Sequence, residues 1–373
     1  MGQVHISEGW EYMKQLDSMP KFFFGSTASQ GYFSRFDYIY RAEEGWRAYV
    51  LIGGPGSGKS TLMKKIADEF ASDYQIILGP CCGNPESLDA VIIPELKVCV
   101  LDGTEPHSIE PKHPGVCETI VNMGDCWDFH VLEENREEIL KTDRECTMLR
   151  ERAGRYTAAI GSLLNDNYRL ALDCTDAAKA ACFASSVARK EFGPRKLIKG
   201  KEAIQFLSSI TPQGHIILED TVHSLCDRVF ILEDENCAAS RIIISVLRAA
   251  ALDSGHDIIT CPCSITPNEK LEHLIIPSLS LGFCTSNCYH PIKNATRRIH
   301  SRRFTNTKLL NERRQKMNFN RKAVKELIAG TAIIAKEANT VYDRLKDYYG
   351  KAMDFTKADA ICDRIIGEIK ERT

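Results

Sequence analysis

A glycine-rich segment follows a short apolar run near the start of the chain, and it constrains the fold more than any other feature. The apolar run 49–52 leads directly into it, and its sequence fits the pattern G-x-x-x-x-G-K-[ST]. Glycines let the backbone wrap closely around phosphate oxygens, and the start of a following helix adds partial positive charge. The pattern therefore predicts a nucleoside-triphosphate site made by Gly53, Gly54, Pro55, Gly56, Ser57, Gly58, Lys59, Ser60 and Thr61.

The residues after this segment predict the helix that such a site requires. Apolar side chains recur there at helical spacing. Lys59 is expected to contact the β- and γ-phosphates, and the Ser60 hydroxyl is expected to ligate Mg²⁺. The pattern does not distinguish adenine from guanine, and no N-K-x-D base-reading segment is present, so ATP with Mg²⁺ is taken only as the default ligand. The apolar set is Leu62, Met63, Ile66, Ala67 and Phe70.

A second apolar run, 98–101, ends in an acid that can hold the metal ion. Asp102 is the predicted Mg²⁺ residue, although an Asp-Gly pair is also a common turn signal. The next residue is Gly103, so a glutamate that could activate water is missing there. Glu105 and His107 are the candidates for the catalytic base, and either could equally be a solvated loop residue. The predicted catalytic residues are Lys59, Asp102, Glu105 and His107.

Length and composition indicate a soluble chain with more than one domain. The 373 residues suggest two or three domains, and 43% hydrophobic with 26% charged residues is typical of globular proteins. The net charge of -2 argues against a general nucleic-acid or membrane binder. No apolar run has the length of a membrane span, and residues 1–7 lack a signal-peptide layout, so we expect a cytoplasmic location. The 15 cysteines are expected to be reduced, and no C-x-x-C zinc pair is present.

An internal repeat suggests that one nucleotide-binding fold occurs twice. Residues 23–31 resemble residues 206–214, and residues 88–94 resemble residues 271–277. His107 is matched by His290 at similar spacing. The predicted fold class is therefore α/β, with tandem P-loop NTPase-type parallel-sheet domains, each followed by a helical arm.

The second copy lacks the features that bind phosphate. The alignment sets 233–241 opposite 53–61, which puts Ala239 at the Lys59 position and Thr285 at the Asp102 position. Acidic side chains replace the glycines and would repel a triphosphate. We expect a nonfunctional site, with Arg241, opposite Thr61, either an arginine finger for the first site or an exposed helix residue.

Charge-rich helical segments follow each copy and complete the predicted domain layout. The segment 293–325 is strongly basic, whereas 133–145 is mainly acidic. An anionic partner of the basic segment is possible but not favoured over a solvated face or pairing with the acidic segment in the chain or in a homodimer. The layout is an N-terminal segment 1–21, an active core 22–130, an arm 131–195, a degenerate core 204–292, and a basic segment with a second arm 293–373.

Five motifs, at 22–31, 53–60, 84–94, 101–107 and 348–355, resemble a bacterial family of tandem P-loop proteins described in general terms as ATPases or ATP-binding proteins. The resemblance covers nearly the whole chain and implies ATP binding by the first copy. Members often keep a glycine-rich loop in the second copy, so the departure here leaves only one working site implied. The expected function is a slow Mg²⁺-dependent ATPase with a role in signalling nucleotide state, and the candidate partners are another protein or a second copy of this chain. The alternatives are a nucleotide or small-molecule kinase and a nucleotide-dependent interaction module with little turnover.

Overall fold

The computed structural model describes residues 19–372. Most of the predicted segment 1–21, including the residues 1–7 considered for a signal peptide, therefore lies outside the described part. The chain forms two compact units. Within the described part, unit 1 contains residues 19–25, 34–152 and 333–372, and unit 2 contains residues 26–33 and 153–332.

Unit 1 is built on a mixed five-stranded sheet. Its strand order is β4 (Ile77–Pro80), β5 (Leu88–Ile93), β6 (Val98–Asp102), β3 (Arg47–Ile52) and β7 (Glu118–Asn122). Strand β3 runs parallel to β6 and β7, whereas β5 runs antiparallel to β4 and β6. The sheet is thus mixed, whereas the sequence predicted a parallel sheet. The loops that flank β5 are too short for the helical crossover that a parallel connection needs.

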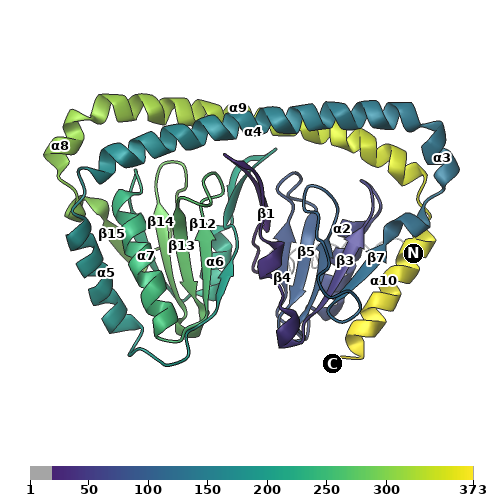
Figure 1. Ribbon diagram of the computed structural model, residues 1–373, viewed down its shortest axis with the longest axis horizontal. Coiled ribbons are helices and arrows are strands. Elements are labelled where there is room, and N and C mark those ends of the chain that lie inside the picture. Colours follow the sequence, from purple (N-terminus) through teal and green to yellow (C-terminus); the bar gives the residue numbers. More distant parts are fainter. Residues whose placement is uncertain (1–18, 373) are drawn as a thin grey trace, which may run out of the picture. The chain divides into compact units, whose positions relative to one another are not determined.

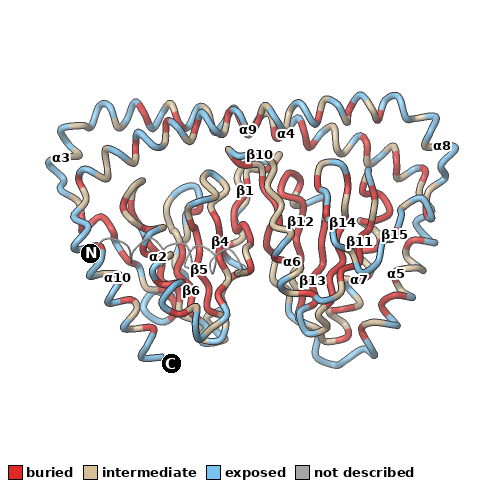
Figure 2. The backbone as a smooth tube through the Cα atoms, turned by 180° about the vertical axis from the view of Figure 1, so that it is seen from behind, coloured by how far each residue is buried: buried red, intermediate tan, exposed pale blue. Residues whose placement is uncertain are grey.

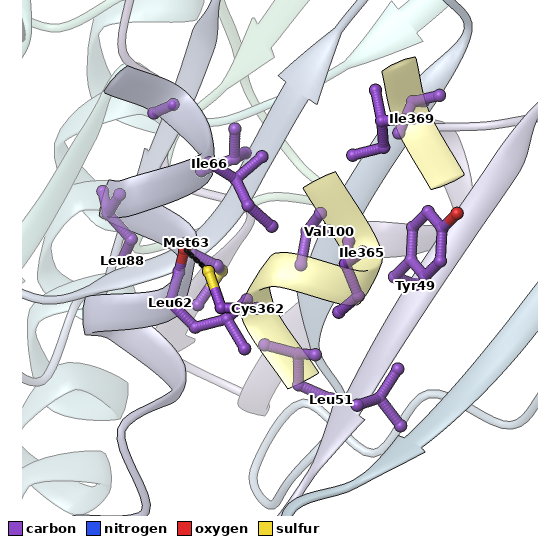
Figure 3. Close-up of a cluster of buried hydrophobic side chains, with 14 of the residues drawn as sticks. Tyr49, Leu51, Leu62, Met63, Ile66, Leu88, Val100, Cys362, Ile365 and Ile369 are labelled. Atoms are coloured by element: carbon purple, nitrogen blue, oxygen red, sulfur yellow. Dashed lines mark hydrogen bonds between the residues drawn. The ribbon is translucent and has the colours of Figure 1, made fainter. Parts of the chain in front are cut away.

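Helices cover the sheet of unit 1 and complete its core. They are α2 (Lys59–Phe70) and α10 (Phe355–Lys370). Unit 1 also contains α3 (Phe129–Glu134), which buries no residue, and the short 3₁₀ turns η1 (Phe36–Tyr38), η2 (Ala42–Glu44) and η3 (Met123–Cys126). All five apolar residues predicted for the face of α2 are buried. They pack with α10, from which Cys362, Ile365 and Ile369 enter the same cluster as Tyr49 and Val100 (Figure 3).

Unit 2 has a six-stranded sheet that repeats this arrangement with one further strand. Its order is β8 (Glu202–Ile204), β12 (Ile258–Pro262), β13 (Leu271–Ile276), β14 (Leu281–Ser286), β11 (Arg228–Glu233) and β15 (Arg297–His300). Strand β11 is parallel to β14 and β15, and β13 is antiparallel to its neighbours. Both units are therefore α/β structures with partly parallel sheets, and their strands are largely buried (Figure 2).

The helices of unit 2 include one that comes from the first half of the sequence. Helix α5 (Ala177–Glu191) packs on α7 (Ala238–Asp253), burying Ala180 and Ala184 against Ile244 and Leu247 (Figure 1). The remaining elements are α6 (Glu219–Leu225), α8 (Thr307–Glu312), η4 (Pro277–Leu279) and η5 (Ser301–Phe304).

Two long helices contribute to both units. Helix α4 (Arg136–Leu172) belongs to unit 1 up to residue 152, and α9 (Arg314–Lys351) belongs to unit 2 up to residue 332. The sequence predicted a single helical arm at 131–195. The structure divides it, because the Asp176 side chain accepts a hydrogen bond from the amide of Lys179 and starts α5 as a new helix.

Two hairpins reproduce the spacing of the sequence repeat. They are β1 (Gly25–Ala28) with β2 (Gly31–Ser34), and β9 (Ser208–Thr211) with β10 (Gly214–Ile217). Gly31 and Gly214 begin the second strands with φ angles of 115° and 110°. Both turns therefore need a residue that tolerates the left-handed half of conformational space.

The basic segment 293–325 has acidic partners inside unit 2. Arg298 forms an ion pair of 2.7 Å with Glu233, and Arg313 forms one of 2.7 Å with Asp173. These partners differ from the expected acidic segment 133–145, whose Glu145 pairs with Arg344. Between residues 19 and 372, no helix is both long and apolar enough to cross a bilayer.

Candidate functional site

The loop of residues 53–58, here called the glycine loop, connects β3 to α2 in unit 1. Gly56 and Gly58 have φ angles of 71° and 84°, a conformation that side-chain-bearing residues rarely adopt. Among the described residues, no hydrogen-bond acceptor is found for the amide groups of Gly56 and Gly58. The loop thus presents free N–H donors beside the positive end of a helix, as anion binding requires.

The Lys59 side chain turns back into the glycine loop. Its Nζ donates hydrogen bonds to the carbonyl oxygens of Gly53, at 2.5 Å, and Gly54, at 3.0 Å. It also lies 3.8 Å from Oδ2 of Asp102. Burial lowers the pKa of Lys59, although Asp102 opposes this shift. Burial likewise raises the pKa of Asp102, and Lys59 opposes that shift. The pair is a partly desolvated charge couple at the carboxyl ends of two adjacent parallel strands.

Asp102 and the glycine loop are joined through Thr104. The Thr104 amide donates to Asp102 Oδ1 at 2.9 Å, and the Thr104 hydroxyl donates to the Gly53 carbonyl at 2.8 Å. Ser60 lies in the first turn of α2, where its hydroxyl accepts a hydrogen bond from the Leu88 amide at 2.9 Å. Thr61, also in that turn, is exposed. The predicted residues Lys59, Ser60 and Asp102 are therefore at one edge of the sheet.

The two candidate bases lie in different environments. Glu105 is exposed, whereas His107 is 7% exposed and its Nε2 lies 3.1 Å from Oδ2 of Asp89. Burial disfavours the imidazolium, but the Asp89 carboxylate outweighs this and raises the pKa of His107. The sequence analysis missed Asp89. The available signal was a lone acid inside the apolar run 88–93.

Residues of α9 contact the glycine loop, and an arginine of α4 contacts another residue of α9. A Cβ atom on Gly54 would lie 2.8 Å from the Tyr349 ring, and one on Gly56 would lie 2.6 Å from the Lys346 carbonyl oxygen. The Arg150 guanidinium lies 4.9 Å from the centroid of the Tyr342 ring. Burial raises the pKa of Tyr342, and the charges of Asp89 and Asp102 add to the shift. Tyr342 and Arg150 therefore belong to the surroundings of the same two carboxylates.

The corresponding loop of unit 2 is shorter than the predicted alignment assumed. Leu51 pairs with Asp102 and Leu232 pairs with Thr285, so Thr285 does take the Asp102 position. The same register sets Gly53 opposite Asp234. The two helices bury residues at equal spacing, and matching these positions sets Lys59 opposite Asn236. The positions are 62, 63, 66, 67 and 70 in α2 and 239, 240, 243, 244 and 247 in α7. Ala239 and Arg241 are thus not the counterparts of Lys59 and Thr61, because fewer residues separate β11 from α7 than separate β3 from α2.

A carboxylate occupies the start of α7. The Asp234 side chain is 5% exposed and accepts hydrogen bonds from the amides of Ser240, at 2.9 Å, and Asn236, at 3.3 Å. These are the kind of N–H groups that would otherwise contact a phosphate. Arg241 is held within unit 2, 3.7 Å from the Tyr168 ring centroid and hydrogen-bonded to the Glu269 carbonyl.

The geometry defines an α/β protein with a glycine-rich loop before a helix, a buried lysine and a carboxylate at one sheet edge of unit 1. Comparison with protein-family models, curated proteins and solved structures finds no match to this chain.

Proposed function

We propose that unit 1 binds ATP with Mg²⁺ at the glycine loop and hydrolyses it slowly, as a P-loop NTPase. Unit 2 is proposed to be a second copy of this fold that has lost the phosphate site. The observation that carries the proposal is Lys59, which is buried and bonded to the carbonyl oxygens of its own loop beside Asp102. When a nucleotide binds, the Lys59 ammonium can exchange the carbonyl oxygens of Gly53 and Gly54 for phosphate oxygens.

The residues present fit a magnesium nucleotide. Free amides of Gly56 and Gly58 and the start of α2 suit a polyphosphate. Ser60 and Asp102 offer the hydroxyl and carboxylate oxygens that Mg²⁺ prefers. When bound, Mg²⁺ would neutralise charge on the phosphates.

The chain itself would orient the phosphates and stabilise charge as it develops. Lys59 supplies the cation, and Asp102 balances it when no phosphate is present. The buried pair of Asp89 and His107 can accept or hold a proton beside the two charged groups. His107 is therefore a better candidate for the base than the exposed Glu105.

The test measures ATP binding and phosphate release with the full-length chain. Lys59→Ala should weaken ATP binding at least tenfold, about 1.4 kcal/mol, and abolish turnover. Lys65→Ala is the matched control, because Lys65 lies on the same helix with its side chain 50% exposed in an ion pair with Asp359. Equal ATP affinity and turnover in both variants would refute the proposed site.

The same assay separates the alternative functions. Phosphate release without an acceptor supports the ATPase. ATP consumption that requires a nucleotide or small-molecule acceptor supports a kinase, and tight binding without either supports an interaction module.

A further inference from the structure

Three side chains in unit 2 form a buried cluster outside the proposed ATP site. One ligand atom from each of Glu272, His273 and His290 lies within 4.8 Å of the others. Their exposed fractions are 4%, 1% and 2%, and the two imidazole rings are 4.7 Å apart between centroids. The cluster combines two nitrogen donors with one carboxylate.

A β-bulge explains how neighbouring residues of one strand reach the same cluster. His273 pairs with Cys261 and Leu271 pairs with Pro262, which leaves Glu272 as the additional residue between them. Successive residues of a regular strand point to opposite faces, and a bulge changes this direction. Unit 1 has an equivalent irregularity at Asp89, but Ala90 stands where His273 stands in unit 2. The second imidazole is therefore specific to unit 2.

The histidines have no hydrogen-bond partners that would explain their burial. Neither ring nitrogen of His273, and neither of His290, has a partner among the described residues. Each buried polar group left without a partner costs roughly 1–3 kcal/mol. Burial of both rings disfavours the charged imidazolium form. Neutral imidazole is the form that binds metal ions.

The charge of the cluster selects among metal ions. Glu272 also contacts the Lys270 ammonium, which compensates its negative charge. A site with little net negative charge is poorly suited to Mg²⁺ or Ca²⁺, which bind through several oxygen ligands. Imidazole nitrogens instead favour transition metals such as Zn²⁺.

We propose that Glu272, His273 and His290 bind one divalent transition metal ion of the Zn²⁺ type in unit 2. A tetrahedral zinc site with bonds of about 2.1 Å separates its ligand atoms by about 3.4 Å. Small side-chain rotations therefore bring the three donors around one ion.

A pocket lies beside two of the three proposed ligands. Glu272 and His290 line it together with His215, Cys263 and Ser264, all within unit 2. His215 Nε2 is buried without a hydrogen-bond partner in the described residues, while its Nδ1 lies 2.9 Å from the Tyr289 carbonyl oxygen. Three protein ligands and one open position, occupied by water or a small ligand, match the composition of zinc sites that perform chemistry.

Titration calorimetry of the metal-free, full-length chain with Zn²⁺ tests the proposal. The expected result is one Zn²⁺ per chain at this site, with the dissociation constant raised at least tenfold in His273→Ala. This variant introduces the residue that unit 1 carries at the equivalent position. His130→Ala, which removes an exposed histidine of unit 1, should bind Zn²⁺ like the parent. Lys59→Ala should also bind Zn²⁺ normally, which separates this proposal from the ATP site.

X-ray absorption of the zinc-loaded parent chain gives a second readout that needs no variant. Nitrogen and oxygen ligands at about 2.0–2.1 Å are expected. Sulfur ligands at about 2.3 Å would place the ion on cysteines and overturn the proposal. Absence of stoichiometric binding, or unchanged affinity in folded His273→Ala, would overturn it as well.

Discussion

The carbonyl oxygen of Lys346 in α9 lies so close to Gly56 that a Cβ atom on this glycine would be only 2.6 Å from it. Gly56 also has a φ angle of 71°. Helix α9 and the glycine loop are therefore in direct backbone contact within unit 1. Any side chain at position 56 must displace one of them.

Gly56→Ala should destabilise the chain by about 1–3 kcal/mol, because it adds both backbone strain and a clash. Urea unfolding measures the change. Gly367→Ala in α10 is the control, since a Cβ atom there meets nothing within 4 Å. It should stabilise the helix by about 0.5–1 kcal/mol. Equal stability of the two variants would contradict the contact between Gly56 and α9.

Asp102→Asn should reduce Mg²⁺-dependent ATP turnover at least tenfold while leaving metal-free nucleotide binding intact. Asparagine can still accept the hydrogen bond from the Thr104 amide, so the loop keeps its anchor. The lost negative charge acts mainly on the metal ion. Steady-state phosphate release and calorimetry provide the two measurements, with exposed Asp125→Asn as the control. If Asp102→Asn lost metal-free nucleotide binding as well as Mg²⁺-dependent turnover, Asp102 would have a structural role instead.

The pairing of His107 with Asp89 should make stability depend on pH. The pKa of His107 is raised above 6.5, so the pair contributes its full stability below pH 6.5. This contribution is lost as the pH rises through the folded-state pKa. His107→Gln should flatten the decline in the free energy of unfolding above pH 6.5. His113→Gln, which changes an exposed histidine, should keep the parental profile. Identical slopes for all three proteins would exclude this linkage.

Arg150→Ala should reduce ATP turnover about tenfold, with a smaller effect on folding stability. Arg150 lies over Tyr342, and burial raises the pKa of the nearby Cys82 thiol to about 12 although the arginine charge opposes this. A cation so close to the carboxylate edge can stabilise a phosphate transition state. Arg152→Ala is the matched control, because Arg152 is an exposed residue of the same helix. If both variants turn over ATP equally, Arg150 has no such role.

Calorimetry with a slowly hydrolysed ATP analogue should find one nucleotide per chain. Asp234 already provides the anion at the start of α7, and a phosphate there would meet an occupied and negatively charged site. Lys59→Ala should remove the single binding event. Two equivalent sites per chain would show that unit 2 accepts nucleotide despite Asp234.

The strand and helix around the glycine loop could be predicted because their signals are local. The apolar run before Gly53 and the spacing from Leu62 to Phe70 each specify one element. The position of Asp102 followed from the end of an apolar strand. In the structure, Leu51 pairs with Asp102, which places this acid beside the end of the strand that leads into the glycine loop.

Other parts of the site depend on contacts that no local pattern encodes. Asp89 reads as a strand residue until the bulge turns it toward His107. Lys346 and Tyr349 reach the glycine loop from nearly three hundred residues away in sequence. The alignment of the second loop was wrong for a related reason. The buried residues of α2 and α7 have the same spacing, so sequence similarity alone does not show that residues are missing from the loop before α7.

The exchange of α5 and α10 between the two halves of the sequence affects how the chain reaches its native state. Helix α10 follows the other described elements in sequence, yet it covers α2 in a core otherwise made from the first half. Helix α5 precedes the strands and helix of the core in which it is buried. A cut in the connection 193–200 would therefore leave each fragment with an apolar helix face separated from its partner. Completing either core requires both fragments. Neither half of the sequence can therefore bury its own apolar helix face without the other half.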